Sequence, residues 1–433
     1  MRIVLIRPNM GDYRSSDAMP PLAMGILAAR SIGHQIRFFD DKTEVIPENL
    51  EADLVAFSVE TFTARRAYQI ADGFRQRGIP VVMGGYHPTF LPEEALLHAD
   101  AVVTGDAEGV WENLLDDLAA GRLQRIYRSD NEAALDNMRI DRSIFAGKRY
   151  APIELAQYGR GCRFVCDFCS IHEFYGTQVR LRPAQQLRDE LESLNNKRLL
   201  FFVDDNLFST KAHLEALLGV LTPLRRRWSC QISIDVARDP ELLDQLAEAG
   251  CRYVLIGFES LEPANLKQMR KPWNQVAGEY RKVVGELHAR GIGVYGTFVF
   301  GYDHDTPDTI RRSLDFALES RLEIANFNPL TPTPGSGLYA RLHAEGRLIS
   351  PQWWLDPDYR YGAPIFAPRL ITPTQLAEGC FEAKRAFYAW SSIARRVLDN
   401  DNQFSWFSTT MTTVANVISR REVYRKQGRR LGA

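Results

Sequence analysis

Short apolar segments alternate with helical segments along most of this 433-residue chain. Strands that are separated by single helices form parallel sheets, because each crossover returns the next strand in the same direction. In the first part of the chain the pattern predicts strands at 3–6, 36–39, 54–58, 81–83 and 101–103, and helices at 21–30 and 64–77. This part is therefore expected to form a doubly wound α/β domain, in which ligands bind at the carboxyl ends of the strands.

A second series of strand and helix units follows residue 150. Strands are predicted at 199–203, 229–234, 253–256, 294–300 and 324–328, and helices at 183–194, 211–224, 240–249 and 273–289. These five or six units are too few for a complete eight-unit barrel.

Three cysteines near the start of this second part, Cys162, Cys166 and Cys169, have the spacing C-x3-C-x2-C. Three thiolates can anchor a four-iron cluster and leave one iron open to a small molecule. A structural zinc site is the alternative, since His172 follows Cys169 and a Cys3His set is common for zinc. The cluster is favoured because all three cysteines lie on one loop, whereas zinc sites usually join two separated ligand pairs. The isolated Cys230, Cys251 and Cys380 are typical of core residues.

The composition is that of an ordinary globular protein, and the net charge of -1 gives no general attraction to nucleic acid or to an anionic membrane. Any charged partner must therefore be met by a local patch. The apolar run at the amino terminus is too short for a signal peptide, and we find no transmembrane segment. We predict a cytoplasmic protein with reduced cysteines and no nucleic-acid partner.

The segment from Tyr158 to His172 resembles the cluster loop of radical S-adenosylmethionine (SAM) enzymes, in which an aromatic residue, here Phe168, precedes the last cysteine. The first part of the chain resembles the cobalamin-binding domain that precedes many of these enzymes. This resemblance runs through Pro20-Pro-Leu-Ala-Met-Gly25, Gly33-His-Gln-Ile-Arg-Phe-Phe-Asp40, Val82-Met-Gly-Gly-Tyr-His87 and Val103-Thr-Gly105-Asp-Ala-Glu108. The D-x-H-x-x-G signature that supplies a histidine to cobalt is missing, and Asn9-Met-Gly-Asp-Tyr-Arg14 stands in its place.

The resemblance implies four parts. A cobalamin-binding domain spans residues 1–136, a linker 137–150, a partial (β/α)6 radical SAM barrel 151–341, and a small helical cap 342–433. The cap is rich in aromatic residues. Together we expect them to close the barrel mouth and shape an apolar pocket, although for any one of them a place in a small helical core packed against the barrel mouth is the more common use. They are Trp353, Trp354, Tyr359, Tyr361, Phe366, Phe387, Tyr388, Trp390, Trp406 and Phe407.

The same resemblance implies contacts to cobalamin from the loops at the strand ends. The expected residues are Asn9, Met10, Ser58, Thr61, Gly84, Gly85, His87, Gly105 and Glu108. His87 follows a later strand than the cobalt-binding histidine of other cobalamin proteins, so it is interpreted as a contact to the nucleotide tail or simply as a turn residue.

For SAM, Asp204 and Asp205 emerge from an apolar strand where carboxylates can accept hydrogen bonds from its ammonium group, although such residues more commonly cap helices. Seven further residues at strand ends or on neighbouring strands are expected to contact SAM: Arg180, Arg182, Ser233, Asp235, Glu259, Gly296 and Gly301. Glu259 additionally requires a partner if it is buried.

The family resemblance thus implies an enzyme with a [4Fe-4S] cluster, SAM and cobalamin as cofactors. Such enzymes cleave SAM reductively to a 5′-deoxyadenosyl radical, and we expect methylation of an unactivated carbon in a hydrophobic or natural-product metabolite by way of methylcobalamin. Cyclisation, ring contraction and sulfur transfer use the same cofactors, and a non-catalytic zinc or cobalamin sensor is the alternative of another class. An electron donor such as flavodoxin or ferredoxin is implied, and the basic segment 420–430 is either a solvated helix end or a dock for such an acidic protein.

Overall fold

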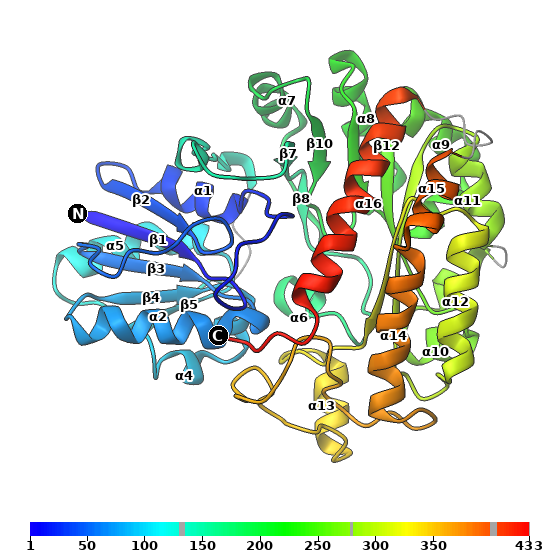
Figure 1. The fold of residues 1–433 in the computed structure, drawn as a ribbon. Helices are drawn as coiled ribbons and strands as arrows, with labels where there is room; N and C mark the ends of the chain where they lie inside the picture. Colours follow the sequence, from blue (N-terminus) through cyan, green and yellow to red (C-terminus); the bar gives the residue numbers. More distant parts are fainter. Residues whose placement is uncertain (130–134, 278–279, 399–404, 433) are drawn as a thin grey trace.

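Two parallel six-stranded sheets, each with its own helices, make up the body of the molecule (Figure 1). The structure is a computed structural model, and it describes residues 1–129, 135–277, 280–398 and 405–432. The first sheet forms the amino-terminal domain and the second forms an open barrel.

The amino-terminal sheet has the strand order β2-β1-β3-β4-β5-β6, with every neighbouring pair parallel. Its strands are β1 (Arg2–Arg7), β2 (Gln35–Asp40), β3 (Leu54–Ser58), β4 (Val81–Gly84), β5 (Ala101–Thr104) and β6 (Ile126–Arg128). Helices α1 (Leu22–Arg30) and α5 (Trp111–Ala119) pack on one face and α2 (Ala64–Gln76) on the other. The central strands are apolar throughout because both faces are covered.

The second sheet has the order β7-β10-β11-β12-β13-β14, again parallel, with β7 and β14 at its two edges. Its strands are β7 (Ile153–Ala156), β10 (Leu199–Phe202), β11 (Trp228–Gln231), β12 (Cys251–Glu259), β13 (Gly293–Phe300) and β14 (Ile324–Pro329). The accompanying helices are α7 (Ala184–Ser193), α8 (Lys211–Leu224), α9 (Pro240–Glu248), α10 (Pro263–Gln268), α11 (Tyr280–His288) and α12 (Pro307–Glu319). The expected six-unit partial barrel is confirmed.

Four short strands were not predicted, and one predicted helix is wrong in extent. β6, β7 and the two-residue strands β8 (Gly159–Arg160) and β9 (Arg180–Leu181) are short, and none of them is a continuous apolar run. The helix predicted at 273–289 is instead a 3-10 segment, Pro272–Ala277, followed by α11. The side chain of Asn274 in the 3-10 segment donates to the carbonyl of Phe258 at 2.7 Å, so this turn is fixed to the end of β12.

The carboxyl-terminal part is helical, as expected, with α13 (Gly337–Ala344), α14 (Pro373–Phe387), α15 (Trp390–Leu398) and α16 (Trp406–Lys426). Six of its aromatic residues pack in the cores of the two domains. Trp353, Trp354 and Tyr359 pack in the core of the amino-terminal domain, and Phe366, Phe387 and Tyr388 pack in that of the barrel. For these six residues the structure supports the alternative of a packed core over a place in a substrate pocket.

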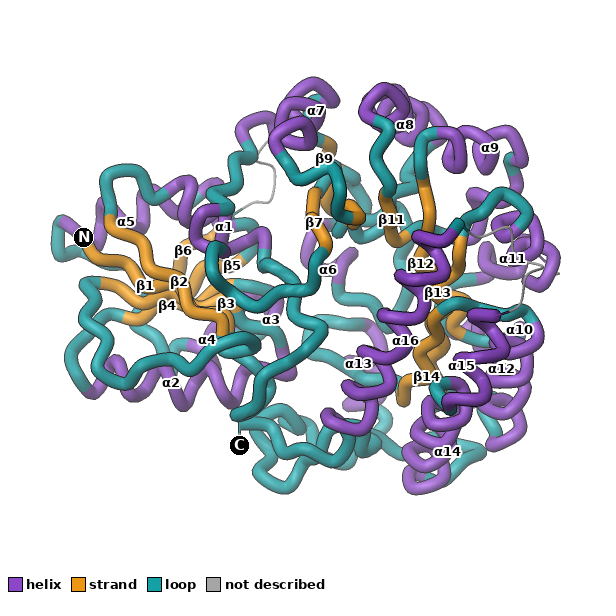
Figure 2. The backbone as a smooth tube through the Cα atoms, turned by 45° about the horizontal axis from the view of Figure 1, so that its top comes forward, coloured by secondary structure: helices purple, strands orange, loops and turns teal. Residues whose placement is uncertain are grey.

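Helix α16 crosses from the barrel to the amino-terminal domain, as Figures 1 and 2 both show. At its end, Glu422 accepts a hydrogen bond from the backbone N–H of Ser16 at 3.1 Å, and the Gly432 N–H donates to the Met10 carbonyl at 2.6 Å. Among the described residues we find no helix with the length and hydrophobicity that a transmembrane span requires.

Gly250 makes the tight turn into β12 and provides a test of this packing. It has φ +94°, and a Cβ added there would lie 2.1 Å from the Arg226 carbonyl oxygen. We expect Gly250→Ala to destabilise the barrel by about 2 kcal/mol or more, measured by urea unfolding. Gly219→Ala, at an open position in the exposed face of α8, is the matched control, and about 1 kcal/mol of stabilisation is expected there. Equal effects would contradict the turn geometry.

Candidate active site between the two domains

A cavity of about 410 Å³ lies where the carboxyl ends of the amino-terminal strands meet the barrel. The amino-terminal domain contributes residues that follow β1, β3, β4 and β5, together with the start of α1. The barrel contributes Leu155, Gln157, Arg160, Phe174, Tyr175 and Val203. Phe174 and Tyr175 belong to α6 (Ile171–Tyr175), which begins two residues after Cys169. The cavity therefore borders the cysteine loop.

Five of the residues expected to contact cobalamin line this cavity: Ser58, Gly84, Gly85, Gly105 and Glu108. Gly85 has φ +103°, and a Cβ there would lie 2.8 Å from the carbonyl oxygen of Val59. A side chain at this position would push against the backbone of the cavity wall. Gly85 and Gly105, which follow β4 and β5, form what we call the glycine edge. It suits a bulky, flat cofactor that must approach the strand ends closely.

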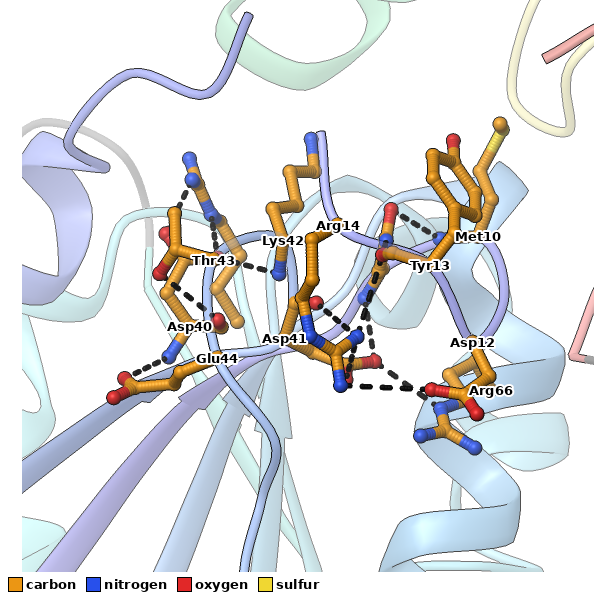
Figure 3. Close-up of polar contacts among 12 residues, drawn as sticks. Met10, Asp12, Tyr13, Arg14, Asp40, Asp41, Lys42, Thr43, Glu44 and Arg66 are labelled. Carbon is orange, nitrogen blue, oxygen red and sulfur yellow. Dashed lines mark hydrogen bonds and ion pairs between the residues drawn. The ribbon is translucent and has the colours of Figure 1, made fainter. Parts of the chain in front are cut away.

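Four other expected cobalamin contacts, Asn9, Met10, Thr61 and His87, are not among the lining residues. Asn9 is buried, and its backbone N–H donates to Asp41 while its side-chain oxygen accepts from the Met10 N–H at 2.9 Å. Asp41 also accepts from Arg66 at 3.1 Å, so this loop is fixed by a buried ionic network (Figure 3). These contacts stiffen the rim of the cavity.

The side chain of His87 is completely buried. Its Nε2 lies 3.1 Å from the Tyr68 hydroxyl and 3.0 Å from Glu94, and its Nδ1 lies 3.4 Å from Thr61 Oγ1. His87 lies in the short helix α3 (Tyr86–Phe90), so the interpretation as a turn residue is wrong. Its ring is enclosed by protein groups, and a contact to the nucleotide tail stays a prediction.

Lys42 lines the cavity and was missed by the sequence analysis. Figure 3 shows its side chain pointing away from the network of Asp40 and Asp41. Burial lowers the pKa of its ammonium group, and the nearby Glu60, also in the lining, opposes that effect. The two residues supply charged groups that can meet the amides or the phosphate of a large cofactor. The only sequence signal for Lys42 is its position just after β2.

Cys162, Cys166 and Cys169 are half-buried and are reduced thiols. Burial raises the pKa of Cys166 to about 12 and that of Cys169 to about 11. Thiols in such surroundings ionise when a bound metal compensates the charge. Three soft sulfur donors on one loop fit the ligand set of an iron–sulfur cluster.

For the zinc alternative, His172 would have to join these cysteines. Its Nε2 lies 3.4 Å from Glu173. Within residues 1–129, 135–277, 280–398 and 405–432, we find no group of three or more His, Cys, Asp or Glu side chains arranged to hold a single metal ion, and this applies to the three cysteines with or without His172.

Asp204 and Asp205 hold the backbone that leads into the cysteine loop. Asp204 accepts hydrogen bonds from the N–H of Tyr158, at 2.9 Å, and from the N–H of Gly159. Asp205 accepts from the N–H of Gly161 at 2.9 Å. Burial raises the pKa of Asp204 to about 7. Both carboxylates thus position the loop, and contact with SAM stays a prediction.

Glu259, expected near SAM, lies at the end of β12 with φ +61°, a left-handed conformation that costs a non-glycine residue of the order of 1 kcal/mol. Its carboxylate is buried and is 2.8 Å from the ammonium group of Lys271, which also donates to the Gly257 carbonyl at 2.9 Å. The sequence analysis predicted that a buried Glu259 requires a partner, but it did not identify Lys271, which lies in the turn after α10.

The remaining expected SAM contacts have varied surroundings. Ser233 bonds to Asn206, and Asp235 pairs with Arg163, the residue after Cys162. A Cβ at Gly296 would meet Leu322 and Phe258, so this position faces the core. A Cβ at Gly301 would meet Phe366.

Buried ion pairs connect the two domains beside the cavity. Arg160, on the short strand β8 (Gly159–Arg160), lies 3.0 Å from Asp106 and 2.6 Å from Glu108. Arg180, on β9 (Arg180–Leu181), also pairs with Asp106. Arg182 instead pairs with Glu190 of α7 and belongs to the barrel scaffold. Arg160 was not predicted, since its partners are far away in the sequence.

Comparison with known proteins adds to this geometry. The family model of the radical SAM superfamily matches residues 157–317, and that of the B12 binding domain matches residues 31–115. Bacteriochlorophyllide d C-12(1)-methyltransferase of Chlorobaculum tepidum is 32% identical over 93% of this chain and 91% of its own length. Bacteriochlorophyllide d C-8(2)-methyltransferase of the same organism is 31% identical over 90% of each chain.

Among solved structures, the radical S-adenosylmethionine methyltransferase TsrM from Kitasatospora setae superposes with a TM-score of 0.68 over 98% of each chain. At 17% identity, this likeness concerns the fold.

The interdomain pairs give a prediction for Arg160→Met. The substitution leaves the buried Glu108 without its cation, while Asp106 keeps its pair with Arg180, so we expect a loss of about 3 kcal/mol and weaker retention of cobalamin. Thermal unfolding and the absorbance of the bound cofactor measure the two effects. Arg198→Met is the control, because Arg198 is half-exposed and pairs with Glu154 at 3.2 Å, where a loss below about 1 kcal/mol is expected. An Arg160→Met variant with unchanged stability and unchanged cobalamin retention would contradict this role.

Proposed function

Because this chain belongs to the radical SAM enzymes that carry a B12-binding domain, we propose that it transfers a methyl group from SAM to an unactivated carbon of a chlorophyll-type tetrapyrrole. The family's cofactors are a [4Fe-4S] cluster, SAM and cobalamin. The observation that carries the proposal is the cavity of about 410 Å³, which both domains line and which borders the helix that follows the cysteine loop. The nature of the substrate rests on the bacteriochlorophyllide methyltransferases that this chain resembles.

The residues of the chain fit these groups. Cys162, Cys166 and Cys169 would hold the cluster, and the glycine edge formed by Gly85 and Gly105 would receive cobalamin. When bound, the cluster and SAM would supply a radical that abstracts a hydrogen atom from the substrate carbon, and cobalamin would supply the methyl group, so the protein contributes binding, orientation and a dry site.

Charged residues around the cysteine loop hold it in position. Asp204 and Asp205 hold the backbone ahead of Cys162 through the N–H groups of Tyr158, Gly159 and Gly161. The Lys271–Glu259 pair stands at the end of β12 with both side chains buried. Such fixed charges keep the geometry of a site without reorganisation during the reaction.

Water exclusion is the task of the domain interface. Arg160 and Arg180 reach from the barrel into the amino-terminal domain through buried ion pairs. Tyr86 and Phe174 pack ring against ring across the same boundary, with centroids 4.6 Å apart. A closed interface protects a reactive radical from solvent.

We further propose a low-potential electron donor such as a flavodoxin or a ferredoxin, because the cluster must be reduced before it acts. All six cysteines are free thiols, and this supports our proposal of a cytoplasmic location, where thiols stay reduced.

The substrate proposal is tested with anaerobically reconstituted enzyme, a bacteriochlorophyllide and SAM carrying a trideuterated methyl group. We expect a product whose mass has increased by one trideuterated methyl group, together with 5′-deoxyadenosine, both detected by mass spectrometry. A product without the label, or a pigment converted only by oxidation or ring closure, would contradict methyl transfer.

The assignment of the cluster ligands gives a second prediction. Replacing Cys162, Cys166 and Cys169 together by Ala is expected to abolish iron binding and 5′-deoxyadenosine formation while cobalamin stays bound, since the cofactors bind to different domains. Cys380→Ala is the matched control, because Cys380 is buried in α14, and we expect its iron content to be normal. Joint loss of iron and cobalamin in the triple variant would argue against separate sites.

A further inference from the structure

Helix α16 has its polar side facing the protein. Ser408, Thr412, Asn416 and Glu422 are its buried residues. The Asn416 side chain donates to the Glu323 carbonyl at 2.8 Å, and the Thr412 hydroxyl lies 3.0 Å from the hydroxyl of Tyr253. The helix is therefore attached to the barrel mainly through polar side chains, although Val423 also packs against the barrel core.

The opposite side of α16 is exposed and largely apolar. Trp406 is 86% exposed, Val414 45%, Val417 41% and Tyr424 46%. At about 100° per residue these four positions fall within one stripe, an arc of about 80° along the helix, and the exposed Thr410 and Arg421 lie in the same arc. A surface helix normally turns such a stripe toward the core, so its outward direction indicates a binding surface.

The stripe continues onto α15. The guanidinium of Arg420 lies over the ring of Trp390, 5.0 Å from its centroid, and over that of Tyr424 at 5.2 Å. Trp390 is 58% exposed, and Leu398 at the end of α15 is 73% exposed. We call these six apolar residues the α15–α16 face: Trp390, Leu398, Trp406, Val414, Val417 and Tyr424.

Positive charge surrounds this face, although the whole chain carries only -1. Arg395, Arg421 and Arg429 have no carboxylate partner in the described part of the chain, and Arg420 donates to the Tyr388 carbonyl. Glu422, the one acidic residue among the described residues of 390–432, is buried, and Asp399 and Asp401 between α15 and α16 lie outside the described residues. Arginine and lysine outnumber all three acidic residues of this segment. A second copy of the chain would bring like charges together across a two-fold axis, so the charges call for an anionic partner.

The position of the α15–α16 face favours a lipid surface over an electron-donor protein as its partner. α16 packs near the amino ends of the barrel strands, where Phe407 lies under Arg227, just before β11, and Tyr253 of β12 donates to Ser408. The cysteine loop lies at the carboxyl ends. The nine residues of β12 span about 30 Å at roughly 3.3 Å per residue, so a donor bound at the Trp406 end of the face would be far from the cluster ligands. The Tyr424 end lies nearer the cavity, because Glu422 beside it contacts Ser16 in the loop after β1.

We propose that the α15–α16 face docks the enzyme on an anionic membrane surface. Tryptophan and tyrosine prefer the headgroup region of a bilayer, and arginines beside them attract anionic lipids. Aliphatic residues between them enter the acyl boundary, as in interfacial helices that lie on a membrane without spanning it. The inference is independent of the chemistry proposed for the active site.

The test uses the full-length enzyme and vesicles of phosphatidylcholine with or without phosphatidylglycerol, in a flotation assay. We expect binding to the vesicles that contain phosphatidylglycerol, and we expect the double variant Trp406→Ser, Val417→Ser to bind at least about tenfold more weakly. Arg421→Glu should weaken binding and flatten its salt dependence. Circular dichroism melting shows that the variants are folded.

Leu97→Ser is the matched control, because Leu97 is 71% exposed on the amino-terminal domain, and its vesicle binding should be unchanged. The proposal is overturned if the unmodified enzyme does not float with the anionic vesicles, or if the double variant binds them as well as the control does. It is also overturned if the double variant instead abolishes self-association measured by analytical ultracentrifugation, since the face would then belong to a second copy.

Discussion

The buried guanidinium of Arg160, shared between Asp106 and Glu108, is the contact on which the relation between the two domains depends. Burial opposes the charge of this side chain, but the two carboxylates together raise its pKa above the usual value. A buried ion pair of this kind adds little net stability compared with an apolar contact, yet breaking it is costly, so its main effect is to fix one geometry. That geometry places the carboxyl edge of the amino-terminal sheet opposite the loop that carries the cysteines.

Two sheet edges that face each other explain how one chain can bring two large cofactors together. The edge of the amino-terminal sheet offers glycines at Gly85 and Gly105, where backbone conformations with positive φ leave room for a bulky ligand. On the barrel side, Asp204 and Asp205 hold the approach to Cys162 by accepting backbone hydrogen bonds. Each domain prepares its own site, and the cavity lies where the sites meet.

The sequence predicts this architecture well where local chemistry decides it. β3 and α8 occur at the expected residues, 54–58 and 211–224, because apolar runs and a Thr210 cap mark their ends. Side-chain partners were harder to predict. Lys271 and Arg160 find their partners 12 and more than 50 residues away, and no periodicity encodes such contacts. Gly296 and His87 were placed by family order alone, which does not reveal that one faces the core and the other is enclosed by Tyr68 and Glu94.

The central claim is that this chain binds a radical SAM cluster and cobalamin at once and uses them together. The most direct test is the metal content of anaerobically purified enzyme supplied with iron and cobalamin, combined with the yield of 5′-deoxyadenosine after reduction in the presence of SAM. The account predicts about four irons and about one cobalt per chain, with 5′-deoxyadenosine formed. Zinc in place of iron, with no 5′-deoxyadenosine, would contradict it.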